Sequence, residues 1–195
     1  MLTIVWDVDD VLNDLMLQWF HHAWKPEHPE CTLSFDDLLH NPPHKILGTE
    51  REDYLASMDQ FRRTGRGLEL TPNPGILDWF VQHGQTFRHI ALTARPLETA
   101  PDVAAWVMRH FGTWIRCFGV VPSRANGGAP VYDRSKIDFL KWLGCGDILV
   151  DDADENIRDA VSLGMRTFQI AQPWNKSTLT SAALGSKLSD LAARN

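Results

Sequence analysis

Apolar residues open the chain and stop abruptly at acidic ones. The segment 2–6 is apolar except for its threonine, and Asp7, Val8 and Asp9 follow it directly. Because apolar residues occupy both parities of this segment, it is typical of a strand covered on both faces, as in a parallel sheet with helices on each side. Alternate residues of a strand share a face, so we expect Asp7 and Asp9 to project together while Val8 points away.

Short apolar runs and helical patterns alternate along the rest of the chain. Further strands are predicted at 87–93, 115–121, 147–150 and 167–170. Helices are predicted at 14–24, 50–63, 76–81, 98–111, 135–143 and 155–163, with a weakly helical tail after residue 174. Strands that alternate with helices predict an α/β fold, here a Rossmann-like parallel sheet with helices on both faces and right-handed crossovers.

A long insertion separates the first strand from the next core helix. About 60 residues lie between them, which is too many for a simple crossover. We therefore expect residues 14–74 to form a small helical cap, inserted after strand one, over a catalytic core of residues 1–13 and 75–195. Thr49 and Glu52 have the spacing of a capping box that opens the second helix of this cap. Ligands of such sheets bind outside the carboxyl ends of the strands, so we expect the chemistry there.

Chemically active side chains follow four of the predicted strands. In chain order they are Asp7 with Asp9, Thr93, Lys136, and Asp151 with Asp152. So many carboxylates beside one ammonium group would be poorly balanced, and a hard dication with oxygen ligands, Mg²⁺, relieves that imbalance. A carboxylate held in this way can attack phosphorus, while a neighbouring carboxyl group exchanges protons with the leaving oxygen and with water. Lysine and threonine side chains suit the phosphoryl oxygens.

With these motifs in this order, the sequence resembles the haloacid dehalogenase-like superfamily of aspartate-nucleophile phosphohydrolases. The motifs are the acidic start at 7–11, the strand 90–93 that ends in threonine, the isolated Lys136, and the acidic pair 151–152. They cover nearly the whole chain with sensible spacing. Because single motifs of this kind often match by chance, it is their joint occurrence that carries the resemblance.

The resemblance implies a role for each motif residue. Asp7 would be the nucleophile that forms an aspartyl-phosphate, and Asp9 the general acid and base. Mg²⁺ would be held by Asp7, the Asp9 backbone carbonyl and Asp151, with Asp152 as a direct or indirect support. The groups implied to bind the phosphoryl group are Thr93 and Lys136, with Ala94 and Arg95 as weaker candidates.

Within the superfamily, the chain is most similar to the 5'(3')-deoxyribonucleotidase group. The similar segments are 11–14, 70–75 and 148–152. The chain departs from that group at Asp10, where glycine is usual, and at Ala94, where serine is expected. The second change removes a hydroxyl group from the phosphate site. Arg95 either replaces that contact or is a plain surface residue.

Several residues of the expected cap, and one beyond it, have two interpretations each. Arg62, Arg63 and Arg66 either receive a second acidic group of the substrate or form a solvated helix end. Asn156 either bonds a metal-bound water or is an ordinary polar residue in the first turn of its helix. The cap aromatics either stack on a base or sugar or belong to the core: Trp19, Phe20, Trp24, Phe35, Tyr54 and Phe61.

Composition narrows the classes of partner. The 195-residue chain has a formal net charge of −6 at pH 7, which argues against a nucleic-acid polymer as its main partner. Its 3 cysteines show no paired spacing and fit a reducing cytosol. No segment has the length and apolarity of a membrane span or the form of a signal peptide. We expect a cytoplasmic protein without a membrane partner, and nothing indicates its oligomeric state.

Together these observations predict a Mg²⁺-dependent phosphomonoester hydrolase that acts on a small phosphorylated metabolite, with a (deoxy)nucleoside monophosphate as the preferred substrate. A sugar-phosphate phosphatase or a phosphomutase is the alternative among enzymes. A dehalogenase has no need of the second acid, Asp9. A receiver-like signalling domain phosphorylated on aspartate is the alternative outside enzymes, but its acidic pair would come early and its lysine last, whereas Lys136 here precedes Asp151 and Asp152.

Overall fold

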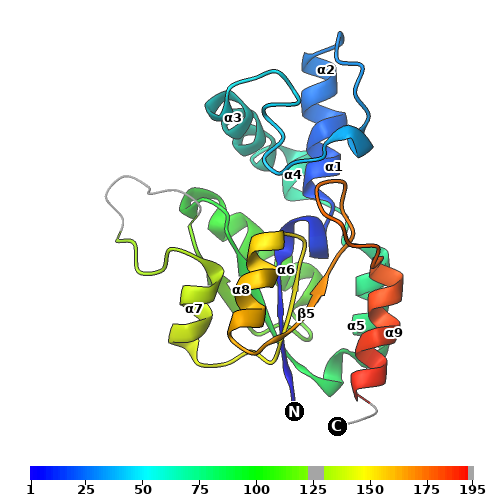
Figure 1. Cartoon of the computed structure of the whole chain (residues 1–195), viewed down its shortest axis with the longest axis vertical. Coiled ribbons are helices and arrows are strands. Elements are labelled where there is room, and N and C mark those ends of the chain that lie inside the picture. The colour runs from blue at the N-terminus through cyan, green and yellow to red at the C-terminus, as the bar shows by residue number, and fades with distance from the viewer. Residues whose placement is uncertain (123–129, 193–195) are drawn as a thin grey trace.

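A parallel five-stranded sheet forms the centre of the molecule (Figure 1). The computed structural model describes residues 1–122 and 130–192. The strands are β1 (Thr3–Trp6), β2 (Arg88–Thr93), β3 (Cys117–Val120), β4 (Ile148–Asp151) and β5 (Arg166–Gln169), and they lie in the order β3-β2-β1-β4-β5. Each neighbouring pair is parallel. The first strand of the chain is therefore the central strand of the sheet.

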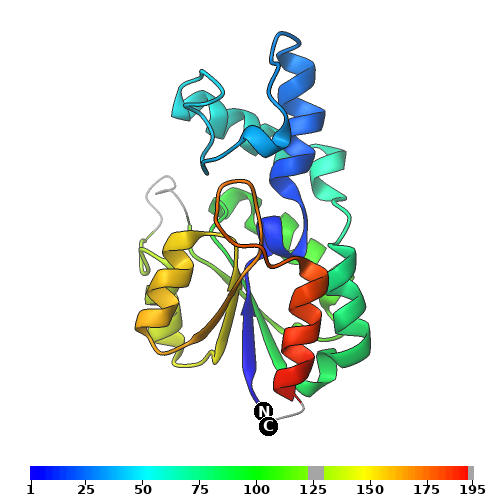
Figure 2. The same cartoon turned by 45° about the vertical axis from the view of Figure 1, so that its right-hand side comes forward.

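Helices cover both faces of the sheet (Figure 2). One face carries α5 (Pro74–His83), α6 (Ala100–Phe111) and α9 (Ser181–Ala192), and the other carries α7 (Lys136–Leu143) and α8 (Asp154–Ser162). Short turns of 3-10 helix, η4 (Gly84–Thr86) and η5 (Leu97–Thr99), flank β2. The predicted Rossmann-like fold is confirmed, and the weakly helical tail is helix α9 over most of its described length.

The burial of both faces of the first strand explains why its residues 4–6 are all apolar. Ile4 and Trp6 are fully buried in the cluster formed with α5, α6 and α9. Val5 is equally buried in a second cluster, formed with α7 and α8. A strand between two layers of helices has no solvated face, so polar residues enter only where the strand ends.

The segment between β1 and α5 lies beyond the carboxyl ends of the strands (Figure 1). Its elements are α1 (Leu15–Trp19), η2 (Phe20–Trp24), α2 (Lys25–Glu27), η3 (Phe35–Asp37), α3 (Arg51–Arg62) and α4 (Gly65–Leu68). We call residues 14–74 the inserted segment. The division into this segment and a core of residues 1–13 and 75–195 stays a prediction, and the stretches 123–129 and 193–195 of that core lie outside the described residues.

The capping box expected at Thr49 and Glu52 is wrong. Helix α3 begins at Arg51 with Glu50 as its N-cap, and no side chain caps it. The N–H of Thr49 is instead bonded to the His44 carbonyl in the preceding turn. Because the threonine lies one residue before the N-cap, its hydroxyl is out of register with the orphan N–H groups of the helix.

No described helix combines the length and the apolar character needed to cross a bilayer. The expected location in the cytoplasm stays a prediction.

A buried histidine ties β2 to the central strand. His89 is 5% exposed, and its Nδ1 accepts a hydrogen bond from the indole Nε1 of Trp6 at 3.0 Å. Its Nε2 lies 2.6 Å from the Gly84 carbonyl, to which it must donate. Both bonds are satisfied by a neutral ring with its proton on Nε2. Burial accordingly lowers the pKa of His89 to about 4.

This neutral histidine should make the fold less stable in mild acid. In the unfolded chain the His89 imidazole is protonated near pH 6.5, whereas in the folded chain it is protonated only near pH 4. Between these two pH values protonation favours the unfolded chain, so the free energy of unfolding decreases as the pH falls through that window. We expect the free energy of unfolding of the wild type relative to His89→Gln to fall by on the order of 3 kcal/mol across it. Urea titrations at several pH values measure this. The exposed control His40→Gln should follow the wild type, and a wild-type advantage over His89→Gln that does not vary with pH would refute the interpretation.

Candidate active site

The register of the sheet brings acidic residues of two strands together. Trp6 of β1 is aligned with Val150 of β4, and the N–H of Asp7 donates to the Val150 carbonyl at 2.9 Å. Asp7 and Asp151 are therefore neighbours at the carboxyl ends of adjacent strands. The chain order reverses between β1 and β4, and such a switch point is where open parallel sheets bind ligands.

Three buried carboxylates meet at this point. Asp7, Asp151 and Asp152 each offer one oxygen, and these oxygens lie within 4.8 Å of one another. Burial and the repulsion from Asp151 raise the pKa of Asp152 to about 8. Burial also raises the pKa of Asp7, although Lys136 offsets part of that rise. Carboxylate oxygens are the ligands that Mg²⁺ prefers, and a dication would remove the repulsion, so the donor set fits this ion.

Lys136 lies between two of these acids. Its Nζ is 2.8 Å from Asp7 Oδ1 and 2.7 Å from Asp151 Oδ2, and the side chain is 3% exposed. Burial alone would lower the pKa of Lys136, but the attraction of Asp151 and Asp7 raises it. The lysine is the first residue of α7, whose N-cap Ser135 accepts a hydrogen bond from the Asp138 N–H at 3.2 Å. This helix start fixes the ammonium group at the sheet edge.

Side chains from α8 and from the loop after β5 orient the acidic pair. Asn156 Nδ2 lies 3.0 and 3.1 Å from the two oxygens of Asp151. The indole Nε1 of Trp174 donates to Asp152 Oδ2 at 2.6 Å, and Asn175 Nδ2 donates to the Asp152 carbonyl at 2.8 Å. Of the two interpretations of Asn156, a bond to a metal-bound water is not what the structure shows, because its amide donates directly to Asp151. Trp174 and Asn175 were not anticipated from the sequence, and the only signal was their position after a predicted strand.

Asp9 is engaged by arginines and stands apart from the three clustered acids. Arg95 Nε and Nη2 donate to its two oxygens at 2.7 and 2.6 Å, and Arg62 Nη2 lies 3.8 Å away. Burial opposes ionisation, but the attraction of Arg95 lowers the pKa of Asp9 below its ordinary value. Arg95 is itself 4% exposed, so it is not a plain surface residue.

The expectation that Asp7 and Asp9 share a strand face is wrong. Strand β1 ends at Trp6, and the chain then turns through η1 (Val8–Leu12), where Asp9 and Asp10 have non-helical backbone angles. The turn, not strand alternation, sets the direction of Asp9. Both carboxylates still line the same pocket.

The end of β2 supplies the remaining predicted phosphate contacts. Thr93 is 1% exposed, and its Oγ1 accepts a hydrogen bond from the Arg95 N–H at 3.3 Å. Ala94 is exposed and lies between them. All three residues line the pocket that also contains Asp7 and Lys136, so the structure brings every predicted site residue except Asp151 to its wall. Asp151 is fully buried behind its neighbours. Their roles stay predictions.

The pocket is small, and the inserted segment supplies part of its wall. Its volume is about 200 Å³. Its walls on the inserted-segment side are Leu15, Met16, Asn41, Tyr54, Met58 and Arg62. Of the cap aromatics, only Tyr54 therefore lines the pocket. The other residues of that group are buried or half-buried in the core cluster: Trp19, Phe20, Trp24, Phe35 and Phe61.

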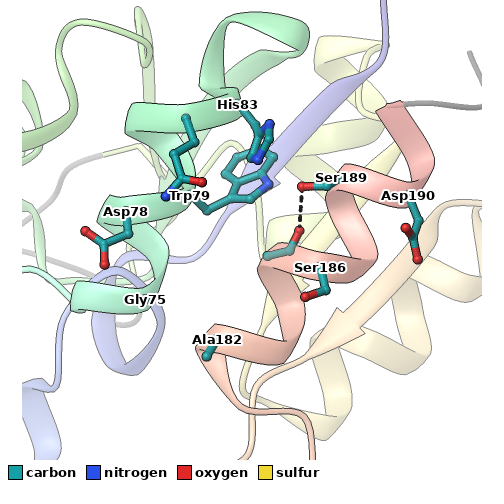
Figure 3. Close-up of a pocket in the computed structure, with 10 residues that line it drawn as sticks. Gly75, Asp78, Trp79, His83, Ala182, Ser186, Ser189 and Asp190 are labelled. Carbon is teal, nitrogen blue, oxygen red and sulfur yellow. Dashed lines mark hydrogen bonds between the residues drawn. The ribbon is translucent and has the colours of Figure 1, made fainter.

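A larger hollow of about 490 Å³ lies between α5 and α9 (Figure 3). Trp79 and His83 on one helix face Ser186 and Ser189 on the other across it. It contains none of the predicted site residues. The smaller pocket at the strand ends is therefore the candidate active site.

Comparison with known proteins identifies the fold. No family model and no curated protein matches the sequence. The structure is similar, with a TM-score of 0.60 and 15% identity, to a haloacid dehalogenase-like hydrolase from Streptococcus pneumoniae, covering 100% of this chain and 99% of that one. The chain has the fold of the haloacid dehalogenase-like hydrolases.

Further solved structures share this fold. A predicted phosphatase from Clostridium acetobutylicum matches with a TM-score of 0.60 and 13% identity, over 97% of this chain and 98% of that one. A proposed β-phosphoglucomutase from Thermotoga maritima matches with a TM-score of 0.53 and 14% identity, over 98% and 100%. The predicted fold family thus agrees with the structure. These likenesses do not support the narrower resemblance to the deoxyribonucleotidase group.

Asp10 adopts a backbone conformation that favours glycine. Its φ is 61°, and its carbonyl accepts a hydrogen bond from Gln172 Nε2 at 2.8 Å. Its Oδ1 accepts a bond from the Met16 N–H at 2.8 Å and so caps α1. Asp and Asn tolerate positive φ better than most residues, which is how this chain does without the usual glycine. Burial and the nearby Asp9 charge raise the pKa of Asp10.

Asp10→Asn should therefore stabilise the protein, and more so at higher pH. Asparagine keeps both the positive φ and the bond to Met16 but removes a buried charge. A carboxyl group whose pKa is raised on folding costs stability as the pH climbs above its unfolded value, so the gain should grow from pH 4 to pH 8. We expect urea unfolding to show a stabilisation that increases steadily with pH. The exposed control Asp36→Asn should show no such trend, and an Asp10→Asn effect that is constant with pH would contradict the account.

Proposed function

We propose that the protein is a Mg²⁺-dependent phosphomonoester hydrolase that acts through an aspartyl-phosphate. The observation that carries the proposal is the meeting of Asp7, Asp151 and Asp152 with one buried lysine at the switch point of the sheet. The fold shared with haloacid dehalogenase-like hydrolases supports it. A receiver-like domain is disfavoured by the order of the motifs and by the inserted segment over the pocket.

The clustered acids are the proposed metal ligands. Asp7, Asp151 and Asp152 would hold Mg²⁺ together with the Asp9 backbone carbonyl, and the bound ion would supply positive charge to the phosphoryl oxygens. Asn156 and Trp174 bond two of these carboxylates, so they would set the ligand orientation. Such supporting bonds commonly matter for metal affinity.

Asp7 is the proposed nucleophile. Its Oδ1 accepts from the Val8 N–H at 2.7 Å and faces Lys136, so Oδ2 is the oxygen proposed to attack phosphorus. A bond forms between Oδ2 and phosphorus as the bond to the leaving oxygen breaks, and the leaving oxygen takes a proton from Asp9. Water then attacks the aspartyl-phosphate, gives its proton to Asp9 and releases phosphate. Thr93 and Lys136 would bind the phosphoryl oxygens.

The ion pair between Arg95 and Asp9 affects the protonation of Asp9 in both proposed steps, formation and hydrolysis of the aspartyl-phosphate. In the arrangement described, Arg95 holds Asp9 as a carboxylate, which suits the base in the second step. The acid role in the first step requires Arg95 to shift its hydrogen bonds from Asp9 to the phosphoryl group. We therefore propose Arg95, with the neighbouring Ala94 backbone, as a phosphate contact.

The size of the pocket favours small esters. At about 200 Å³ it is below the range of about 300–1,000 Å³ typical for drug-sized ligands, a class that includes nucleosides. We therefore favour a phosphorylated sugar or a metabolite of similar or smaller size over a (deoxy)nucleoside monophosphate. A phosphomutase remains the second candidate because a proposed β-phosphoglucomutase shares the fold.

Asp7→Asn should abolish turnover of phosphate monoesters while the protein stays folded. The amide cannot form the acyl phosphate, so we expect the rate to fall by at least about 10³-fold, as is usual when a nucleophile is removed. The assay is phosphate release from a panel of small phosphorylated metabolites, with and without Mg²⁺. Asp78→Asn, on the exposed side of α5, is the matched control. Wild-type rates in Asp7→Asn would rule out the nucleophile assignment.

Asp151→Asn should weaken metal binding. The substitution removes one ligand charge, and we expect the Mg²⁺ concentration for half-maximal activity to rise by at least about tenfold; Trp174→Phe, which only frees Asp152, should have a smaller effect. Calorimetric titration with Mg²⁺ measures the same loss without turnover. The half-buried Asp159 of α8 does not belong to the acidic cluster, so Asp159→Asn should titrate like the wild type. An unaltered titration of Asp151→Asn would count against the site.

A further inference from the structure

We propose that Arg62 selects phosphate esters whose leaving group carries a carboxylate. The inference rests on the proposed phosphatase function and adds a substrate class to it. Arg62 is the last residue of α3, in the inserted segment, yet its side chain lines the pocket with Asp9, Thr93 and Lys136. It therefore shares the pocket with the groups proposed to bind the phosphoryl group, and we infer that it meets the leaving group of the ester.

One edge of the Arg62 guanidinium is hydrogen-bonded to Asp59, and the other edge makes no hydrogen bond in the described part of the chain. Nη1 donates to Asp59 Oδ1 at 2.9 Å, which fixes the side chain against its own helix. Nε is buried and has no hydrogen-bond partner in the described part of the chain. Nη2 lies 3.8 Å from Asp9 Oδ2, beyond hydrogen-bond distance. Nε and Nη2 form the side-on fork with which arginine binds a carboxylate through parallel bonds.

In the arrangement described, Asp9 makes no hydrogen bond to this edge of Arg62. Each of its oxygens already accepts a short bond from Arg95, at 2.6 and 2.7 Å. Arg95 uses its own Nε and Nη2 for that purpose, so the structure shows the side-on geometry that we infer for Arg62 with a substrate. A buried donor without a partner destabilises the protein, and an incoming carboxylate would remove that penalty.

The neighbouring arginines do not offer the same contact. Arg63 is 56% exposed and pairs with Glu98 at 3.4 Å outside the pocket. Arg66 is exposed on α4. The walls beside Arg62 are apolar, with Met16 and Met58, and suit a short aliphatic stem between the two anionic groups. The substrate class is therefore a short phosphorylated hydroxy acid.

The test compares two non-hydrolysable ligands, 3-phosphonopropionate and propylphosphonate, which differ only in a carboxylate against a methyl group. In calorimetric titrations with Mg²⁺, the wild type should bind the first at least about tenfold more tightly, the scale of a charge-assisted bidentate contact. Arg62→Met should bring the ratio close to one by weakening only 3-phosphonopropionate. Arg62→Lys keeps a charge beside Asp59 but lacks the fork, so it should lose most of the ratio.

Arg63→Met is the matched control on the same helix turn and should keep the wild-type ratio. Equal binding of both ligands by the wild type overturns the proposal. So does an Arg62→Met variant that keeps the ratio, or one that weakens both ligands alike, because the arginine would then only join the inserted segment to Asp9. Phosphate release from esters, measured separately, tests the proposed hydrolase function. Turnover without the binding ratio rejects Arg62 alone, and the ratio without turnover rejects the hydrolase alone.

Discussion

A buried ammonium group between two buried carboxylates is the contact on which the rest of the site depends. Lys136 lies 2.8 Å from Asp7 and 2.7 Å from Asp151, in a place where unpaired charges would cost on the order of several kcal/mol each. One lysine cannot balance the third acid, Asp152, whose pKa is raised to about 8. A bound cation would let this third acid ionise, which is why the sheet edge is the proposed metal site.

The central position of β1 determines which residues can reach this contact. Its neighbours β2 and β4 end beside it, so Thr93 and Asp151 arrive with their strands and need no long loop to bring them there. The inserted segment leaves the core at the same edge and returns to it, and its Arg62 lines the same pocket as Thr93 (Figure 1). The core thus supplies the proposed chemistry, and the inserted segment supplies the wall that meets the leaving group.

The positions of site residues that follow strands could be predicted from the sequence, whereas the contacts that depend on turns and loops could not. Asp7 and Asp151 could be placed together because both follow apolar strands of one parallel sheet. The pairing of Asp9 with Arg95 could not be foreseen, since it depends on a turn in which Asp10 has a φ of 61°. Trp174 follows the last strand, but nothing local shows that its indole reaches Asp152. Thr49 matched a capping motif, but the N-cap of α3 is Glu50, one residue after the threonine.

The indole of Trp174 contacts both the acidic cluster of the core and the inserted segment. It bonds Asp152 through Nε1, and its ring packs edge-on against Phe35 of the inserted segment, with 6.0 Å between ring centroids. Replacing the inserted segment with a foreign one to alter selectivity would therefore also disturb Asp152, one of the proposed metal ligands. A replacement segment that keeps an aromatic side chain at position 35 would preserve the packing of Trp174 and, with it, the position of that acid.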